Sequence, residues 1–471
     1  MNMQGRWPGC WEVLSMERYD LLSEYLGSVT DQIRCKKARG YISEELACHI
    51  EDQKEAFIED GLTEEEALKE SLRQMGDPVS VGVEMDRIHR PRPDWKLLAF
   101  ISIFSIVGLI LQYHICLTAG TVLAADPSSS PLPLPGFSQF ANQCCYTLVG
   151  LLCMAVIYYA DYTLIGRFSL LLWWLFFFSI LFVVCTGPVL MGSFPYLRIY
   201  LYLFAPLFAG ILYRARGGGF GRIFLCILHG LCALLLAGRG VGSTRTAFSL
   251  GIIFLLMVCA AVAKGWFHVS RRPALLLLTV GPLLTGALWL LLADQFGWLK
   301  AYQKARIAAF FNLIYDPEGI SYITATIRKL MGGWQLLGGS PGKVFGFLPG
   351  FSYDYIITFL FTSWGIIPGL IILTGFVLLF IRIFRIVLRH PNCLGMMVGL
   401  ACGLALLDHT LCYVLSNMGF ILFSQLSMPF LSYGLGTTVV TYIMMGILLS
   451  IYRYKDVLPE PKVKKWQFTI Q

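Results

Sequence analysis

The chain has 471 residues, of which 56% are hydrophobic and 14% charged, against about 25% charged in an average soluble domain. The formal net charge is +8, but the Lys and Arg residues lie mainly between apolar segments, so the charge does not indicate a nucleic-acid-binding surface. The 14 Cys residues are scattered, and most lie inside apolar segments, where Cys behaves as a small hydrophobe. Neither a disulfide framework nor a metal site is expected.

The first ninety residues are polar and strongly charged, and they predict a small cytosolic bundle of helices over residues 1–90. The expected helices cover residues 15–39, 43–61, 63–76 and 77–88. Gly40 is expected to end the first helix, and Thr63 with Glu66 has the spacing of a capping box at the start of the third. So small a bundle buries little core. We expect it to serve for docking or regulation and to take no part in an active site, because it lies on the other side of the bilayer from Asp354, with no span to carry it across.

About ten apolar segments follow between Trp95 and Tyr452, each long enough to cross the roughly 30 Å hydrocarbon core of a bilayer as a helix. The expected spans are 95–117, 141–160, 168–191, 196–213, 222–238, 246–263, 273–293, 354–380, 395–419 and 433–452. They predict an all-α, polytopic membrane protein. Its transmembrane domain covers residues 95–455, and a cytosolic tail follows at 456–471.

Basic residues in the short loops indicate the orientation, because cytoplasmic loops of membrane proteins are enriched in Lys and Arg. They predict that both termini lie in the cytosol and that one long loop, residues 294–353, lies outside. Arg239 and Arg245 break the pattern, since both fall in a short outward loop. Two interpretations stay open: the side chains extend to lipid headgroups, or they form an anion site facing the outer leaflet.

The long outward loop is amphipathic. Residues 294–310 carry Lys300 and Arg306 among aromatic neighbours, and a second basic segment follows at 321–330. Helices that lie on a membrane interface have this composition. Such a surface would suit a lipid that carries phosphate.

Two acidic positions lie at or near membrane depth. Asp354 follows the long loop at the start of an apolar span. It could cap a helix N-terminus or take a proton from a sugar hydroxyl, and the two roles are compatible. Asp408-His409 lies in or near the ninth span, where an interhelical hydrogen bond is the favoured interpretation.

An ordered set of motifs resembles the SEDS family, the FtsW, RodA and SpoVE proteins of bacterial cell-wall assembly. The matching pieces are Arg306-Ile307 to Phe311-Asn312, Asp316-Pro317-Glu318-Gly319, Ser321-Tyr322, Gly338-Gly339, Phe347-Leu348-Pro349, Asp354-Tyr355-Ile356-Ile357, Asn417-Met418-Gly419 and Met428-Pro429-Phe430-Leu431-Ser432-Tyr433-Gly434. The resemblance covers about residues 95–455. Residues 61–67 and 76–78 separately resemble the small helical domains found ahead of bacterial permeases.

The resemblance implies a glycosyltransferase that polymerises lipid II on the outer face of the cytoplasmic membrane, in division, elongation or sporulation. It implies a class B penicillin-binding protein as partner and no cofactor, metal or nucleic acid. Asp354 occupies the place of the family's essential acid and is the expected base toward the acceptor 4-hydroxyl. The departing undecaprenyl diphosphate needs positive charge. The expected substrate-binding residues are Arg239, Arg245, Lys300, Arg306 and Ser432.

The chain departs from the family at several acids. Gly350 and Ser352-Tyr353 stand where the family has Glu and His-Thr, and Thr362-Ser363 replaces an acidic pair. Tyr196-Leu197-Arg198 replaces the family's "QPSE" motif, and the acid of "QPDxG" is absent around 238–244. Two other interpretations therefore stay open. One is a catalytically inactive scaffold or regulator of wall assembly; the other is a lipid transporter, although no repeat of broken spans is visible.

Overall fold

The computed structural model describes residues 10–125, 136–190, 193–297, 301–312, 318–319, 321–333, 335–339, 354–422, 425–455 and 457. Within these ranges the regular structure is helical, apart from one isolated β-bridge between Leu190 and Ser193. The chain divides into two compact units. One contains the described residues up to Pro93 and the short segment that begins at Tyr452, and the other runs from Asp94 to Ile451.

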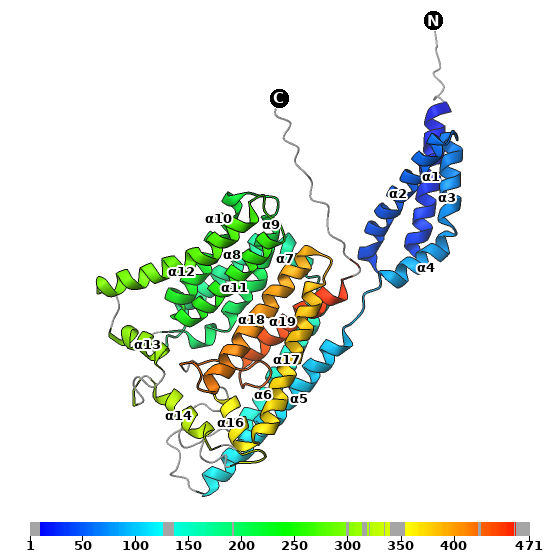
Figure 1. Ribbon diagram of the computed structural model, residues 1–471. Helices are drawn as coiled ribbons and strands as arrows, with labels where there is room; N and C mark the ends of the chain where they lie inside the picture. Colours follow the sequence, from blue (N-terminus) through cyan, green and yellow to red (C-terminus); the bar gives the residue numbers. More distant parts are fainter. Residues whose placement is uncertain are drawn as a thin grey trace. The chain divides into compact units, whose positions relative to one another are not determined.

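The first unit is a bundle of four helices (Figure 1): α1 (Cys10–Asp31), α2 (Lys36–Glu59), α3 (Glu64–Met75) and α4 (Pro78–Ile88). The predicted capping box is confirmed, because Thr63 donates its amide to Glu66 Oε2 at 3.2 Å and Glu66 is the third residue of α3. The predicted helix end at Gly40 is wrong. Buried apolar residues of α2 recur every four positions from Ala38, so the helix runs through Gly40, whose missing side chain costs about 1 kcal/mol of helix propensity.

The second unit contains ten helices long and apolar enough to cross a membrane, counted over the described residues. They are α5 (Trp95–Ala125), α6 (Phe137–Tyr159), α8 (Ser169–Thr186), the continuous segment of η1 (Pro195–Leu197), η2 (Tyr200–Leu203) and α9 (Phe204–Arg214), α10 (Phe220–Leu235) with η3 (Leu236–Gly240), α11 (Thr244–Ala263), α12 (Arg271–Gln295), α17 (Ile366–Leu388), α18 (Cys393–Asn417) and α19 (Leu435–Arg453). The predicted all-α, polytopic membrane fold is confirmed. Shorter helices are α7 (Thr163–Arg167), α13 (Ala301–Phe311), α14 (Tyr322–Met331) and α16 (Ile356–Ser363).

The predicted eighth span, 354–380, is wrong over residues 354–365. A short buried helix, α16, precedes the true span α17, and the chain breaks between them at Gly365, whose φ is +96°. Residues 335–338, which precede α16 in the chain, lie against this break: the Ile366 amide donates to the carbonyl oxygen of Gln335 at 2.9 Å. A Cβ atom at Gly365 would lie 2.8 Å from the backbone oxygen of Leu336, so this close approach needs glycine.

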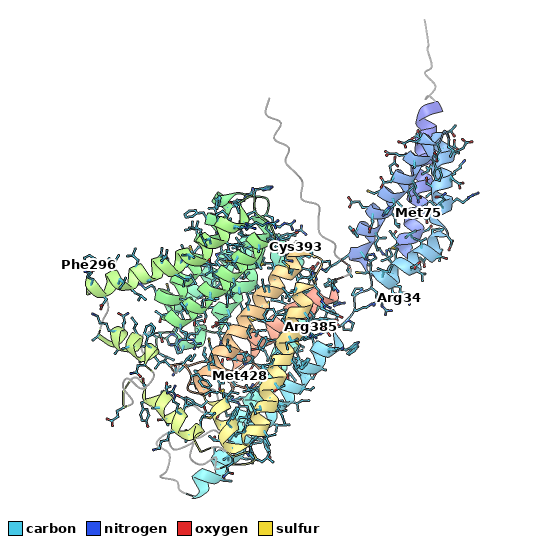
Figure 2. All side chains as sticks on the ribbon, viewed as in Figure 1. Arg34, Met75, Phe296, Arg385, Cys393 and Met428 are labelled. Atoms are coloured by element: carbon cyan, nitrogen blue, oxygen red, sulfur yellow. The ribbon has the colours of Figure 1, made fainter. Side chains whose placement is uncertain are left out.

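The motif between α18 and α19 is a buried turn fastened to the first two spans. Gln112 of α5 donates to the Leu431 carbonyl at 2.7 Å, and Gln143 of α6 accepts from the Gly434 amide at 3.0 Å. Phe430 has a φ of +65°, which residues other than glycine rarely adopt. These contacts therefore hold a strained backbone. Met428, labelled in Figure 2, marks where this turn begins, and its amide donates to Ser432 Oγ.

Candidate active site

A polar cavity of about 610 Å³ opens at one end of the transmembrane unit. Its charged and imidazole side chains are Arg198 beside η1, Arg245 in the first turn of α11, Asp354 before α16, and His409 of α18, and four tyrosines also line it. Hydroxyl groups of Ser243, Thr246, Ser427 and Thr437 complete the polar wall. The cavity therefore brings together groups from segments separated by more than two hundred residues of sequence.

Asp354 is held in place through its backbone. The Asn417 side chain donates from Nδ2 to the carbonyl oxygen of Asp354 at 2.9 Å, and its Oδ1 accepts from the Thr358 hydroxyl at 3.1 Å. Tyr413 lies one turn earlier on α18, and its hydroxyl accepts from the Ile356 amide at 2.8 Å. The last turns of α18 thus hold the first turn of α16 and direct the preceding residue toward the cavity.

The Asp354 side chain is not a helix cap. Tyr355 is the N-cap residue of α16, and no side chain caps that helix. The carboxyl group lines the cavity, and the residue is only 9% exposed. Burial raises the pKa of the Asp354 carboxyl to about 7, and the positive charge of Arg198 acts in the opposite direction. A carboxyl group with this pKa can both accept and release a proton near neutral pH.

Arg198 supplies the positive charge that acts on Asp354. Its Nη2 donates to Ser193 Oγ at 3.0 Å and its Nη1 to Gln425 Oε1 at 3.4 Å, which fixes the guanidinium at the cavity wall. The remaining nitrogen, Nε, is buried and has no hydrogen-bond partner in the structure. Arg198 can therefore stabilise the carboxylate form of Asp354, and one of its guanidinium nitrogens has no partner.

Arg245 and His409 form a second polar group in the same cavity. One guanidinium nitrogen of Arg245, Nη1, is buried without a hydrogen-bond partner, and so is Nδ1 of His409. The amino end of α11 reaches the cavity at Ser243, whose Oγ accepts from the Thr246 amide at 3.3 Å. A half-buried cation beside a helix N-terminus favours the binding of an anion.

Arg239, Arg306 and Ser432 are not among the cavity lining, and the roles of all the other predicted site residues stay predictions. Arg239 is exposed in η3, and Arg306 is exposed on α13, although its charge acts on Arg198. Ser432 is buried in the turn before α19, where its hydroxyl accepts from the Met428 amide. Lys300 falls outside the described residues. Of Arg239 and Arg245, only Arg245 lines the cavity that Asp354 also lines.

The predicted interhelical hydrogen bond of Asp408 is present, because the Tyr202 hydroxyl donates to Asp408 Oδ2 at 3.1 Å. Its neighbour His409 is a cavity residue that the sequence interpretation had left structural. Arg198 was also missed. The sequence feature that could have identified Arg198 is its positive charge inside the apolar fourth span, at the end that the predicted topology places outside. Among the described residues, no three His, Cys, Asp or Glu side chains are grouped so as to hold a metal ion.

These features define a polytopic membrane protein with a carboxylate and two arginines in a cavity at one end of its helices. The family model for FtsW, RodA and SpoVE, described as "Cell cycle protein", matches residues 220–457. The chain belongs to this family, as the resemblance predicted, and is a multi-pass protein of the bacterial cytoplasmic membrane.

Curated relatives extend the similarity to the greater part of the chain. A protein named "Probable peptidoglycan glycosyltransferase FtsW" from Geobacter sp. (strain M18) is 27% identical over 384 residues, which cover 76% of this chain and 96% of the relative. "Stage V sporulation protein E" of Bacillus subtilis is 28% identical over 156 residues, which cover 32% of this chain and 43% of the relative.

Solved structures share the fold. One, described as "Structural coordination of polymerization and crosslinking by a peptidoglycan synthase complex", aligns with a TM-score of 0.58 and 18% identity, over 77% of this chain and 98% of the other. The crystal structure of the rod shape determining protein RodA of Thermus thermophilus aligns with a TM-score of 0.51 and 16% identity, over 77% and 97% of the two chains.

The role of Asn417 can be tested by a double-mutant cycle with Thr358. Asn417→Ala leaves the buried carbonyl of Asp354 without its donor, and we expect it to lower the free energy of unfolding by about 1–3 kcal/mol. Thr358→Val removes the hydroxyl group that donates to the Asn417 side chain. Because the two side chains share a hydrogen bond, the two losses should be less than additive in thermal unfolding of the purified protein. Strict additivity would contradict the network.

Proposed function

We propose that the protein is a peptidoglycan glycosyltransferase that polymerises lipid II on the outer face of the bacterial cytoplasmic membrane, in division, elongation or sporulation. The observation that carries the proposal is the cavity itself: a buried carboxyl group with a pKa of about 7 and two arginines line the same cavity, and one buried nitrogen of each arginine has no hydrogen-bond partner. The names of the curated FtsW and RodA relatives support the same reaction class.

The proposed reaction begins with proton transfer. The carboxylate of Asp354 takes the proton of the acceptor's 4-hydroxyl as that oxygen attacks the anomeric carbon of the lipid-linked donor. A new glycosidic C–O bond forms while the bond from the anomeric carbon to the diphosphate oxygen breaks. The proton then leaves Asp354 for solvent, and undecaprenyl diphosphate departs. The half-ionised state expected of Asp354 near neutral pH suits a group that must be reset in each cycle.

Arg245 is the group best placed to hold the diphosphate. Negative charge accumulates on the leaving oxygen in the transition state, so fixed positive charge lowers the barrier. The unpartnered Nη1 of Arg245 and the nearby N-terminus of α11 are such groups, and Arg306 and Lys300 remain proposed contributors on the outward loop. A guanidinium binds phosphate oxygens through two parallel hydrogen bonds, which an ammonium cannot reproduce.

Orientation and partner belong to the same proposal. We infer that both termini lie in the cytosol, because the basic short loops then lie inside and the cavity faces outward. A class B penicillin-binding protein is the proposed partner, supported by the solved relative's description as part of a peptidoglycan synthase complex. The four-helix unit at the N-terminus would then be a cytosolic docking or regulatory module.

A second candidate function is a catalytically inactive scaffold of wall assembly. The observation in its favour is the absence of acids at Thr362 and Ser363, where the family has an acidic pair. Thr362 donates its hydroxyl to the carbonyl of Thr358 within its own helix, and Ser363 Oγ is buried without a partner. The discriminating experiment is polymerisation of lipid II by the purified protein, alone and with a partner transpeptidase; a chain that makes no glycan in either case is a scaffold.

Replacing Asp354 tests the base directly. Asp354→Asn keeps the shape of the side chain but cannot accept the proton, and we expect glycan synthesis from lipid II to fall about a hundredfold to ten-thousandfold. Asp354→Ala should fail equally. Thermal unfolding of both variants should stay close to that of the wild type, which separates lost chemistry from lost fold. An Ala variant that polymerises at the wild-type rate would remove Asp354 from the mechanism.

The charge of Arg198 should affect how the rate of glycan synthesis depends on pH. The base works as a carboxylate, so the rate should rise with pH through a value near 7 in the wild type. Arg198→Gln removes the cation that lowers the pKa of Asp354, so the pKa should rise and the acid limb should move to higher pH. Arg198→Lys should restore much of the wild-type profile. An unchanged acid limb in the Gln variant would show that Arg198 does not act on the base.

Arg245 and Arg239 form a matched pair, since one lines the cavity and the other is exposed in the same loop region. Arg245→Gln should weaken donor binding, seen as a higher KM for lipid II, and Arg245→Lys should recover only part of it. The Arg239→Gln variant is the comparison. An equal loss in both would extend the anion site to Arg239, whereas no loss at Arg245 would overturn the proposed diphosphate contact.

A further inference from the structure

Three of the four tyrosines in the Asp354 cavity come from one short segment of the chain. Tyr196 lies in η1, and Tyr200 and Tyr202 lie in η2, at the start of the fourth span. The proposed proton transfer and the proposed diphosphate contact use none of them. Their hydroxyl groups have different surroundings, and the difference indicates which tyrosine is available to a ligand.

Two of these hydroxyl groups are bonded to the protein. Tyr196 donates to the carbonyl oxygen of Pro188 at 3.0 Å, and Tyr202 donates to Asp408 Oδ2 at 3.1 Å. Tyr202 is also only 3% exposed, so its ring belongs to the packed wall of the cavity. The two hydrogen bonds hold the segment on either side of Tyr200.

Tyr200 differs, because its hydroxyl group makes no hydrogen bond to the part of the chain that the structure describes. The residue is half-buried, and its ring lies against the first turn of α19. A Cβ atom at Gly436 would come within 3.2 Å of both Cε2 and the hydroxyl oxygen of Tyr200. Packing therefore positions the ring, while the hydroxyl group keeps its hydrogen-bonding capacity.

The chemistry of this side chain selects a sugar among the parts of the proposed substrate. A pyranose has a face of C–H groups, which packs on an aromatic ring, and a rim of hydroxyl and acetamido groups, which need hydrogen-bond partners. Tyrosine offers an apolar ring with a polar tip. A polyprenyl chain would use only the ring, and a diphosphate would use only the hydroxyl group.

We propose that Tyr200 contacts the saccharide of the substrate and makes the cavity selective for a lipid diphosphate that carries a sugar. Its ring packs on a face of that sugar, and its hydroxyl group bonds to the polar rim. This inference rests on the proposed function. The sugar is bonded directly to the diphosphate, so its contact must lie in the same cavity as Arg245 and Asp354, as Tyr200 does.

Native mass spectrometry of the purified full-length protein can measure the binding, in the Asp354→Asn background so that no ligand is consumed. The ligands are undecaprenyl diphosphate, the same lipid carrying the disaccharide without peptide, and lipid II. Tyr200→Phe removes only the hydroxyl group and should bind both saccharide lipids about fivefold less tightly. Tyr200→Leu also removes the ring and should weaken their binding further, by up to about tenfold. Neither variant should change the binding of undecaprenyl diphosphate.

Two further variants in the same background serve as comparisons. Tyr113→Phe removes the hydroxyl group of an exposed tyrosine on α5 that does not line the cavity, so all three ligands should bind as before. Arg245→Gln should weaken the binding of all three, because each carries the diphosphate. Thermal unfolding of each variant shows whether the fold is retained.

Several outcomes would overturn the role of Tyr200. Unchanged affinities in both Tyr200 variants would do so, and so would an equal loss of all three ligands, which would indicate an effect on the diphosphate or on the fold. A loss for lipid II alone would indicate a contact with the peptide. A starting protein that binds undecaprenyl diphosphate as tightly as the saccharide lipids would remove the saccharide contact and leave the anion site. A protein that binds none of the three would contradict the proposed function itself.

Discussion

The hydrogen bonds of Asn417 are the constraint on which the candidate site depends. A carboxyl group near membrane depth is useful only if the backbone that carries it is fixed, since an unpaired polar group in this environment costs several kcal/mol. Asn417 satisfies the carbonyl of Asp354 and the hydroxyl of Thr358 at once. The carbonyl oxygen of Asp354 is therefore hydrogen-bonded, while its side chain lines the cavity.

The electrostatics of the cavity favour an anionic ligand. Two arginines and one carboxyl group line it, and each arginine keeps a buried nitrogen without a partner. An unsatisfied buried donor is costly to the empty protein and gains a partner on binding. The free energy that the fold loses by leaving these donors unpaired is recovered when a phosphate or a developing oxyanion occupies the cavity, so ligand recognition and local strain have the same origin.

Much of the transmembrane fold could be predicted from the sequence, because each span is a continuous apolar segment with its own length and borders. The break before α17 could not. Residues 356–370 carry no charged side chain, and the break depends on the contact of Gln335 and Leu336 with Gly365, which the local composition does not indicate. In the bundle, Gly40 was a misleading signal because the buried periodicity of α2 overrides one glycine.

The site residues divide in the same way. Asp354 could be predicted because it lies beside a motif. Arg198 is 156 positions away, and its role is visible only in the structure, where its charge acts on that carboxyl group. Arg239 and Arg245 were equivalent in the sequence. Their different positions follow from the tight turns between them, where η3 leaves Arg239 exposed and the Ser243 cap starts α11 with Arg245 at the cavity.

The joint at Gly365 gives α17 a mechanical property. Because segment 335–338 is hydrogen-bonded across the joint, α16 and α17 meet at a stiff angle rather than through a loose linker. The Trp364 indole also donates to His114 Nδ1 of α5 at 3.1 Å, which adds a second support at the same point. Because the two helices are held together at this joint, a tilt of α17 at its far end, around Leu388, would rotate α16, the helix that begins just after Asp354.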